Sequence, residues 1–294
     1  MARNRASLNV SIVGAGQVGT ALAALLRRKG FKIVSVVSRR KASAQRLAAL
    51  LRCRSYSQNI ADLHPATNFL LIATADEAIS TVAHRVARSA PLNFSRLVVA
   101  HTSGLLTSEE LAPLKRKGAT TFSLHPIQTF PRHQSLHQQL RRLQGISYGV
   151  EGSPAARRFA RALVARLGGR VLEVPKDEKI SYHLACVLAS NYSVALLGAV
   201  YDISKRFADP RHLEMLVKTS VENAFNLTPQ QALTGPIARG NVKAIQQHLA
   251  ELRRKHKGLT DLYKALGLYT LELTKRGRRL PPKTAKHLKK ILSR

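Results

Sequence analysis

The stretch Val10-Ser-Ile-Val-Gly-Ala-Gly-Gln-Val-Gly-Thr-Ala-Leu-Ala-Ala-Leu-Leu26 decides the fold of this chain. A short β-rich run is followed by the G-x-G-x-x-G spacing of Gly14, Gly16 and Gly19, and then by small apolar residues at helical spacing. In such a strand, turn and helix, the first glycine makes the turn. The second lets the backbone approach a pyrophosphate, and the third lets the helix pack closely. The free N–H groups of the helix N-terminus then favour the phosphates.

The sequence therefore predicts a dinucleotide site at this turn, and the alternative is a turn of the same kind that binds no ligand. Its expected contacts are Gly14, Ala15, Gly16, Gln17, Val18 and Gly19.

The second expected strand, Phe31–Val37, is followed by residues that bear on the choice of cofactor. An Asp or Glu at its end would bind a free ribose 2′-hydroxyl, but the chain has Ser38, Arg39 and Arg40 there. A hydroxyl and a guanidinium suit a 2′-phosphate. We therefore expect NADP rather than NAD. The alternative is a solvated basic turn in a chain that is basic throughout.

The composition describes a globular chain of 294 residues, long enough for two domains. Cys53 and Cys186 lack metal-ligand spacing, which predicts free thiols in a reducing compartment and no metal site. The N-terminus Met1–Ala6 is too short and polar for a signal peptide. Polar residues interrupt the apolar run Leu184–Val200. We therefore expect a cytoplasmic protein with a buried helix there, not a membrane span.

The formal net charge is +32, which would attract nucleic acid or another polyanion. The charge is densest from Arg253 to Arg294, where 14 Lys and Arg residues stand against Asp261 and Glu272. However, the sequence carries no zinc-finger spacing, no RNP signature and no clear helix-turn-helix pattern. A general surface bias is the preferred interpretation, and a polyanion partner is the alternative.

Strands and helices alternate as far as Pro175, and helical periodicity dominates after it. This pattern predicts an α/β fold, with a Rossmann-type doubly wound sheet in residues 1–175 and an all-α domain in residues 176–294. Residues 132–145 are polar and are expected to form a mobile loop.

Ligands of such sheets bind beyond the carboxyl ends of the strands, so the residues that follow successive strands should meet in one crevice. His125 ends a buried strand there and is fixed by Pro126. Its imidazole can exchange a proton with a carbonyl or hydroxyl oxygen while a hydride moves to or from a nicotinamide. The alternative is a histidine that shapes the turn.

Two other strand ends are expected to contact the cofactor. Thr74, Ala75 and Asp76 should border the nicotinamide, and Asp76 is also expected to cap the helix Ala78–Ala90. The second strand end is expected to contact the nicotinamide ribose or the substrate, or else only to cap its own turn. It consists of His101, Thr102 and Ser103.

The first helix of the second domain carries a polar stripe on an otherwise apolar surface. Lys179, His183, Ser190 and Asn191 recur at helical spacing, and buried polar groups need partners or a ligand. We expect Lys179 and His183 to assist catalysis, and Ser190 and Asn191 to bind substrate. The alternative is a set of hydrogen bonds inside a helical bundle.

The segment Leu233-Thr-Gly-Pro-Ile-Ala-Arg-Gly240 is expected to form a tight loop between helices. A single arginine on a rigid loop suits a carboxylate or a phosphate. Thr234 and Arg239 are therefore expected to bind substrate, and the alternative is a plain connector.

Five motifs in order carry a family resemblance. They are Gly14-Ala-Gly-Gln-Val-Gly19, His101-Thr-Ser-Gly104, His125-Pro-Ile-Gln-Thr-Phe130, Tyr182-His183 with Ala189-Ser-Asn191, and the loop Leu233–Gly240. From about Leu8 to Leu273, the chain resembles the Rossmann-like proteins that carry domain of unknown function 2520. The resemblance implies an NADP-type Rossmann domain and a helical domain like the C-terminal part of 6-phosphogluconate dehydrogenase.

Relatives of that family include pyrroline-5-carboxylate reductase, ketopantoate reductase and prephenate dehydrogenase. The resemblance implies a dimer built through the helical domains. It also likens His125-Pro126 to the His-Pro pair of prephenate dehydrogenases, where the histidine assists oxidation of a hydroxyl. The family's substrate is not established. This chain departs from the family at Asn241, where an acid is common, and in its basic tail.

We therefore expect an NADP-dependent oxidoreductase that transfers a hydride to or from a small anionic carbonyl, hydroxy or imine compound. Its expected partners are that substrate and a second copy of the chain, without a membrane. The alternative is an NADPH-binding sensor or interaction protein that performs no catalysis and docks a polyanion.

Overall fold

The structure is a computed structural model that describes residues 8–277 and 280–294. The expectation for Met1–Ala6 and the charges of Arg278 and Arg279 therefore lie outside the described residues. The chain divides into two compact units between Ser190 and Asn191. The sheet ends earlier, at Glu173, and the predicted domain boundary between residues 175 and 176 stays a prediction.

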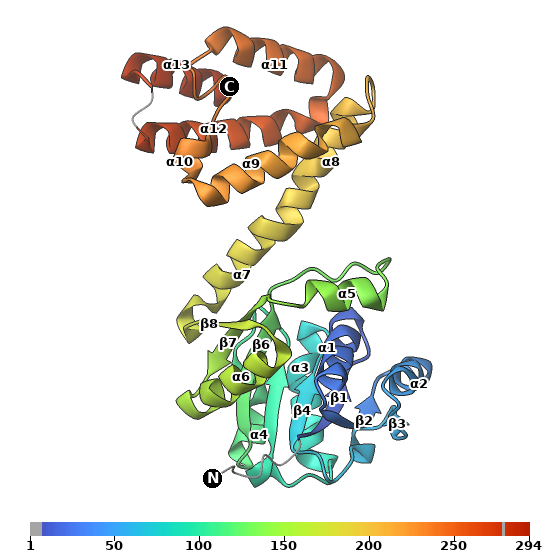
Figure 1. The fold of residues 1–294 in the computed structure, drawn as a ribbon. Helices are drawn as coiled ribbons and strands as arrows, with labels where there is room; N and C mark the ends of the chain where they lie inside the picture. Colours follow the sequence, from blue (N-terminus) through green and yellow to red (C-terminus); the bar gives the residue numbers. More distant parts are fainter. Residues whose placement is uncertain (1–7, 278–279) are drawn as a thin grey trace. The chain divides into compact units, whose positions relative to one another are not determined.

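An eight-stranded sheet forms the centre of the first unit (Figure 1), in the order β3-β2-β1-β4-β5-β6-β7-β8. Only β6 and β7 pair antiparallel. The chain order reverses between β1 and β4, which makes the carboxyl ends of these strands the switch point where ligands bind. The strands are β1 Asn9–Val13, β2 Lys32–Val37, β3 Tyr56–Ser57, β4 Phe69–Ile72, β5 Val98–His101, β6 Thr120–Pro126, β7 Ser147–Gly152 and β8 Arg170–Glu173.

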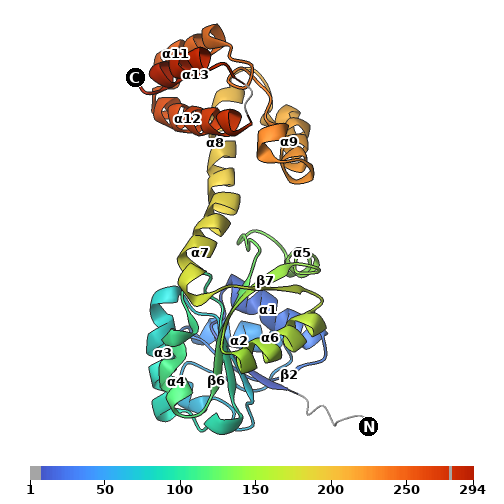
Figure 2. The same cartoon turned by 90° about the vertical axis from the view of Figure 1, so that its left-hand side faces the viewer.

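Helices cover both faces of this sheet (Figure 2), which confirms the predicted doubly wound fold. β4 illustrates the reason, because Phe69 and Leu71 pack into the core on one face while Leu70 and Ile72 pack into the core on the other. A strand buried on both faces reads as an uninterrupted apolar run. The first core contains α1 Gln17–Arg28, α2 Lys41–Leu50 and α6 Pro154–Leu167, and the second contains α3 Asp76–Ser89 and α4 Ala112–Arg116.

Short 3₁₀ helices connect several of these elements. They are η1 Ile60–Asp62, η2 Phe94–Arg96, η3 Ser108–Leu111 and η4 Lys176–Glu178. Cys53 and Cys186 are both free thiols, as the sequence predicts.

The expected mobile loop over residues 132–145 is wrong, because this segment contains helix α5, Leu136–Arg142. The Ser135 hydroxyl accepts a hydrogen bond from the Gln138 backbone at 3.3 Å, and the Gln138 side chain accepts one from the Ser135 backbone at 3.0 Å. This reciprocal capping box starts the helix. Leu140 and Leu143 then pack against the core of the first unit.

An uninterrupted helical stretch runs from Lys176 to Ser204 and is long and apolar enough, by length and composition alone, to cross a membrane. It consists of η4, α7 Lys179–Val187, the π-helical turn η5 Leu188–Tyr192 and α8 Ser193–Ser204. The expectation of a buried helix over Leu184–Val200 is wrong for the single chain. Leu184 is 55% exposed and Val194 is 68% exposed, because no described element of the chain covers that apolar surface.

The second unit is all helical, as predicted, and no strand follows Glu173 among the described residues. Ile245, Leu249, Leu271 and Leu288 form a core among its last three long helices. Besides α8, its elements are η6 Pro210–Leu213, α9 Glu214–Asn226, α10 Pro229–Ala232, α11 Val242–Lys255, η7 Lys257–Leu259, α12 Thr260–Arg276 and α13 Pro282–Leu292.

Candidate functional site

The three glycines of the first turn occupy three different environments. Gly14 has a φ of +110°, and a Cβ there would lie 2.4 Å from the carbonyl oxygen of Ala73. A Cβ on Gly19 would lie 2.1 Å from the Gly14 carbonyl oxygen. A Cβ on Gly16 would meet nothing within 4 Å. Gly14 and Gly19 therefore serve the turn and the close packing of α1, whereas Gly16 leaves open space.

The N-terminus of α1 faces that space without a competing group. Gly16 is the N-cap of the helix, no side chain caps it, and its first turn contains no acidic residue. Unsatisfied N–H groups and the positive end of the helix dipole therefore remain for an anion. The turn fits the pyrophosphate of a dinucleotide.

A cavity of about 590 Å³ extends from this turn past the end of β2. Ser38, Arg39 and Arg40, which follow β2, line it together with Arg85 from α3. No Asp or Glu appears in its described lining, while Ile60 supplies an apolar wall. The described lining of this cavity is therefore cationic at the end of β2, where the sequence predicts a 2′-phosphate. No local pattern in the sequence points to Arg85, because it lies on α3, far along the chain from the end of β2.

A second cavity, of about 340 Å³, continues from Gly16 and Thr74 towards the ends of β5 and β6. The two cavities share Gly16, Ala73, Thr74 and Ala75. The Thr74 hydroxyl is buried and has no hydrogen-bond partner in the described structure, which favours a bound ligand group at this junction. Further predicted residues that line the second cavity are Gln17, Val18, Asp76, Thr102, Ser103, His125 and His183.

His125 is held at the edge of the second cavity by a tyrosine. Its Nδ1 lies 2.7 Å from the Tyr182 hydroxyl on α7, and the two rings are perpendicular. Burial, assisted by the positive charge of Lys179, lowers the pKa of His125 to about 4. Burial also raises the pKa of Tyr182 above its usual range. Both groups are therefore neutral near pH 7.

Lys179 is buried behind this pair and does not line the cavity. Its ammonium donates to the Ser123 hydroxyl at 3.1 Å and to the Ser103 carbonyl at 3.4 Å. It also lies 5.5 Å from the centre of the Tyr182 ring. Burial lowers the pKa of Lys179 to about 8. Lys179 therefore contacts the residues behind the cavity and not the cavity itself.

The strand ends beside His125 differ in part from the sequence expectations. Asp76 does not cap α3, because Ala75 is the N-cap and Asp76 is the first helical residue. Its carboxylate instead favours the positive end of the helix dipole and accepts a hydrogen bond from the Ser103 hydroxyl at 2.8 Å.

His101 lies behind the cavity, with its side chain fully buried. Its Nδ1 accepts the Ser103 N–H at 3.2 Å, so its Nε2 donates to the Thr107 carbonyl at 2.9 Å. Burial lowers the pKa of His101 to about 4. These hydrogen bonds cap the turn that follows β5, which is the alternative that the sequence leaves open for this strand end.

The remaining predicted residues do not line either cavity. The Ser190 hydroxyl donates to the Cys186 carbonyl at 2.6 Å, within its own helix, and the π-helical turn alters the regular spacing between His183 and Asn191. Asn191, Thr234 and Arg239 belong to the second unit, where the last two are exposed in the loop before α11. Their roles in substrate binding stay predictions.

Two known families match the chain. Residues 2–126 match the Rossmann-like domain, and residues 146–270 match the domain of unknown function 2520. The two matches follow one another along the chain with a short gap. No curated protein matches the chain.

Solved structures of similar fold cover nearly the whole chain. One, provisionally described as an NADP oxidoreductase from Bacteroides fragilis, is 23% identical with a TM-score of 0.73, covering 90% of this chain and 98% of the other. A protein from Thermotoga maritima is 25% identical with a TM-score of 0.69, covering 92% and 100%. An imine reductase from Myxococcus stipitatus in complex with NADP⁺ is 18% identical with a TM-score of 0.63, covering 97% and 99%. At these identities, the likenesses to the two oxidoreductases show the fold.

Proposed function

Because the chain belongs to the proteins that join a Rossmann-like domain to a domain of unknown function 2520, we propose that it is an NADP-dependent oxidoreductase. The observation that carries the proposal is one continuous pair of cavities, which runs from the arginines after β2, past the glycine turn, to His125.

The described residues fit the proposed cofactor at each of its parts. Ser38, Arg39 and Arg40 would hold the 2′-phosphate, and the turn at Gly16 would hold the pyrophosphate. The buried Thr74 hydroxyl would give a polar partner to the nicotinamide end. When bound, the nicotinamide ring supplies or accepts the hydride.

His125 is the proposed proton donor or acceptor for the reacting bond. It lines the cavity and is neutral near pH 7, because burial lowers its pKa. A neutral imidazole beside a carbonyl can polarise it without carrying a full charge. Lys179 has a pKa of about 8, which is near working pH, and its charge acts on His125 from behind the cavity.

The described lining of the second cavity distinguishes two substrate classes. It contains one carboxylate, Asp76, and neither Lys nor Arg. An anionic keto or hydroxy acid needs a cation, and Arg239 is the residue that the sequence predicts for that role. A protonated imine is itself a cation, which the Asp76 carboxylate would stabilise.

The test combines cofactor binding with turnover. Calorimetry should give tight binding of NADPH and much weaker binding of NADH, and Arg39→Ser with Arg40→Ser should remove that difference. Absorbance of the reduced nicotinamide should then be followed with panels of keto acids and cyclic imines. No heat with either dinucleotide would refute the cofactor assignment, and no turnover with any panel member would refute the catalytic one.

We further propose that two copies of the chain associate through their helical units. The support is the uncovered apolar surface of α8 and α9, where Val194 is 68% exposed, Leu216 65% and Phe225 87%. Monomeric soluble proteins rarely leave so many large apolar side chains in water.

One observation favours a second candidate function, the binding of a polyanion. The exposed side of α13 carries Lys283, Lys286, Lys289 and Lys290 without an acidic residue. Its apolar side, with Ala285, Leu288 and Leu292, is buried in the core of the second unit. A helix that binds a membrane surface inserts its apolar side into the lipid, and the apolar side of α13 is already buried in the protein. The basic face therefore suits the phosphates of a duplex nucleic acid better than a lipid surface.

Anisotropy of a fluorescein-labelled 20-base-pair DNA duplex tests this second candidate at several salt concentrations. Lys286→Glu with Lys290→Glu should abolish binding. Arg88→Glu with Arg116→Glu changes the net charge equally on the first unit and should have little effect. Equal losses in the two double variants would refute a site on α13.

A further inference from the structure

The antiparallel pairing of β6 and β7 places Gly149 directly opposite His125. A Cβ on Gly149 would lie 2.2 Å from the hydroxyl oxygen of Tyr182 and 2.6 Å from the ring carbon that bears it. Any other residue at position 149 would therefore occupy the place of the tyrosine hydroxyl. The strand leaves a side-chain-sized gap beside His125, and Tyr182 from α7 fills it.

A second glycine supports the histidine ring. A Cβ on Gly104 would lie 2.9 Å from Cε1 of His125 and 3.0 Å from each ring nitrogen. The imidazole therefore rests on the backbone at Gly104, while Tyr182 holds its Nδ1 at 2.7 Å. Contacts from two separate segments fix both the position and the rotation of the ring.

The hydrogen bond between the two side chains can run in either direction, because a protonated phenol donates its O–H and its oxygen also accepts. When Tyr182 donates, the Nδ1 of His125 accepts. A neutral imidazole that accepts at Nδ1 carries its proton on Nε2. The described structure gives His125 no other hydrogen-bond partner, which leaves the Nε2–H for the cavity.

We propose that Tyr182 is a positioning residue, seated over Gly149, that fixes His125 in the neutral form with its proton on Nε2. The proposal rests on the proposed function for its catalytic meaning. It specifies that the site offers a hydrogen-bond donor to the substrate atom that receives the proton. Tyr182 touches neither cavity, so it acts through His125.

The groups around His125 support the neutral form. Lys179 and His183 on α7 oppose a positive charge on the ring, and Asp76 on α3 favours one. Burial opposes the charged form most strongly. Donation from Tyr182 to Nδ1 adds to this effect, because a hydrogen bond to the neutral form lowers the pKa.

Nuclear magnetic resonance of the ¹⁵N-labelled full chain tests the proposal without substrate. His125→Gln identifies the resonances. The native chain should show the Nε2–H form alone, titrating well below pH 6.5. Tyr182→Phe should give a mixture of both neutral forms and a higher pKa for His125, because the donor to the neutral form is lost. An Nδ1–H form in the native chain would overturn the proposal.

Tyr148→Phe is the matched control. Tyr148 neighbours Gly149 on β7, and its buried hydroxyl has no hydrogen-bond partner in the described structure. This variant should leave the tautomer and the titration of His125 unchanged. Gly149→Ala should reproduce the effect of Tyr182→Phe by displacing the hydroxyl. A Tyr182→Phe chain whose His125 behaves like that of the control would refute the positioning role.

Kinetics give a separate readout once a substrate is found. Tyr182→Phe should lower kcat by about tenfold or more, since the partner that orients a catalytic imidazole has at least that effect elsewhere, and it should leave the KM for NADPH unchanged. A chain without turnover would refute the proposed function and leave the resonance result standing. Unchanged kcat in Tyr182→Phe would refute the proposal about Tyr182.

Discussion

At the scale of single residues, a side chain on Gly16 should affect cofactor binding without affecting folding. Gly14 and Gly19 approach backbone atoms so closely that a side chain would force the turn apart, whereas a methyl group on Gly16 meets only open space. The same space lies in front of the α1 N-terminus, where a pyrophosphate would approach. Substitutions within one short turn should therefore have different consequences.

Gly16→Ala should weaken NADPH binding by about tenfold, or roughly 1.4 kcal/mol, because the methyl group occupies the phosphate position. The melting temperature of the ligand-free chain should stay unchanged, since nothing is displaced. Gly19→Ala is the comparison, and it should lower the melting temperature itself. Calorimetry and thermal unfolding measure the two effects. Unchanged affinity in Gly16→Ala would contradict the proposed phosphate site.

The buried histidines make the stability of the first unit depend on pH. Burial lowers the pKa of His101 to about 4, whereas an unfolded histidine titrates near 6.5. Between these values the unfolded chain binds more protons, so stability rises with pH and is lost as the pH falls from about 6.5 to 4. His125 adds a similar contribution.

For His101 alone, the free energy of unfolding should fall by about 2 kcal/mol from pH 7 to pH 5. Urea unfolding at the two pH values measures the loss. His101→Gln removes the titrating group and should show a loss that is smaller by this amount. An equal loss in the two proteins would mean that His101 is not buried in its neutral form.

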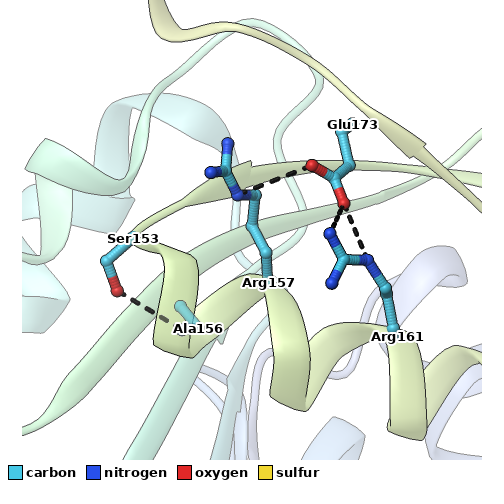
Figure 3. A network of polar contacts seen from close by, with 5 residues as sticks. All are labelled: Ser153, Ala156, Arg157, Arg161 and Glu173. Atoms are coloured by element: carbon cyan, nitrogen blue, oxygen red, sulfur yellow. Dashed lines mark hydrogen bonds and ion pairs between the residues drawn. The ribbon is translucent and has the colours of Figure 1, made fainter.

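At the scale of elements, helix α6 carries both an N-terminal cap and surface ion pairs (Figure 3). Ser153 caps its N-terminus by accepting a hydrogen bond from the Ala156 backbone at 3.3 Å. On the surface, Arg161 and Arg157 approach Glu173 of β8, and all three side chains are at least a third exposed. Exposed ion pairs contribute little to stability, whereas a cap satisfies a backbone donor at the helix end.

Ser153→Ala should therefore lower the free energy of unfolding by about 1 kcal/mol. Glu173→Gln should change it by less than about 0.5 kcal/mol. The midpoints of urea unfolding, at an unchanged slope, compare the two variants. A larger loss in Glu173→Gln would show that the ion pairs, not the cap, tie α6 to the sheet.

Elements with a strong local signal could be predicted from the sequence. The glycine turn and β4 fall in this class, because close packing and two-sided burial dictate their residues. The sequence does not indicate helix α5, since its apolar residues Leu136, Leu140 and Leu143 form one narrow face in a polar segment. The position of the Tyr182 hydroxyl over Gly149 could not be predicted from the local sequence either. It depends on an antiparallel register that brings Gly149 opposite His125 and on a residue 57 positions further along the chain than His125.

At the scale of the whole molecule, the uncovered apolar surface of the second unit is the feature that the single chain does not explain. The sequence predicts burial for Leu184–Val200 from its composition, but composition does not say which chain provides the cover. A second copy is the proposed answer.

Val194→Asp tests that assembly, because it places a charge on a side chain that is 68% exposed in the single chain. Light scattering after size exclusion should give the native chain twice the mass of 32.3 kDa and the variant the mass of one copy. Leu50→Asp, at a leucine of α2 that is 46% exposed, should stay dimeric. A monomeric native chain would contradict the assembly.

The position of the apolar helix along the chain has a consequence for biosynthesis. The stretch Lys176–Ser204 begins after the last strand, so all strands of the sheet emerge from the ribosome before this apolar helix does. Translation of residues 205–294 takes roughly 5 to 20 seconds at ordinary elongation rates. The apolar surface of this stretch therefore emerges after the complete sheet and before α11, α12 and α13, whose shared core completes the helical unit.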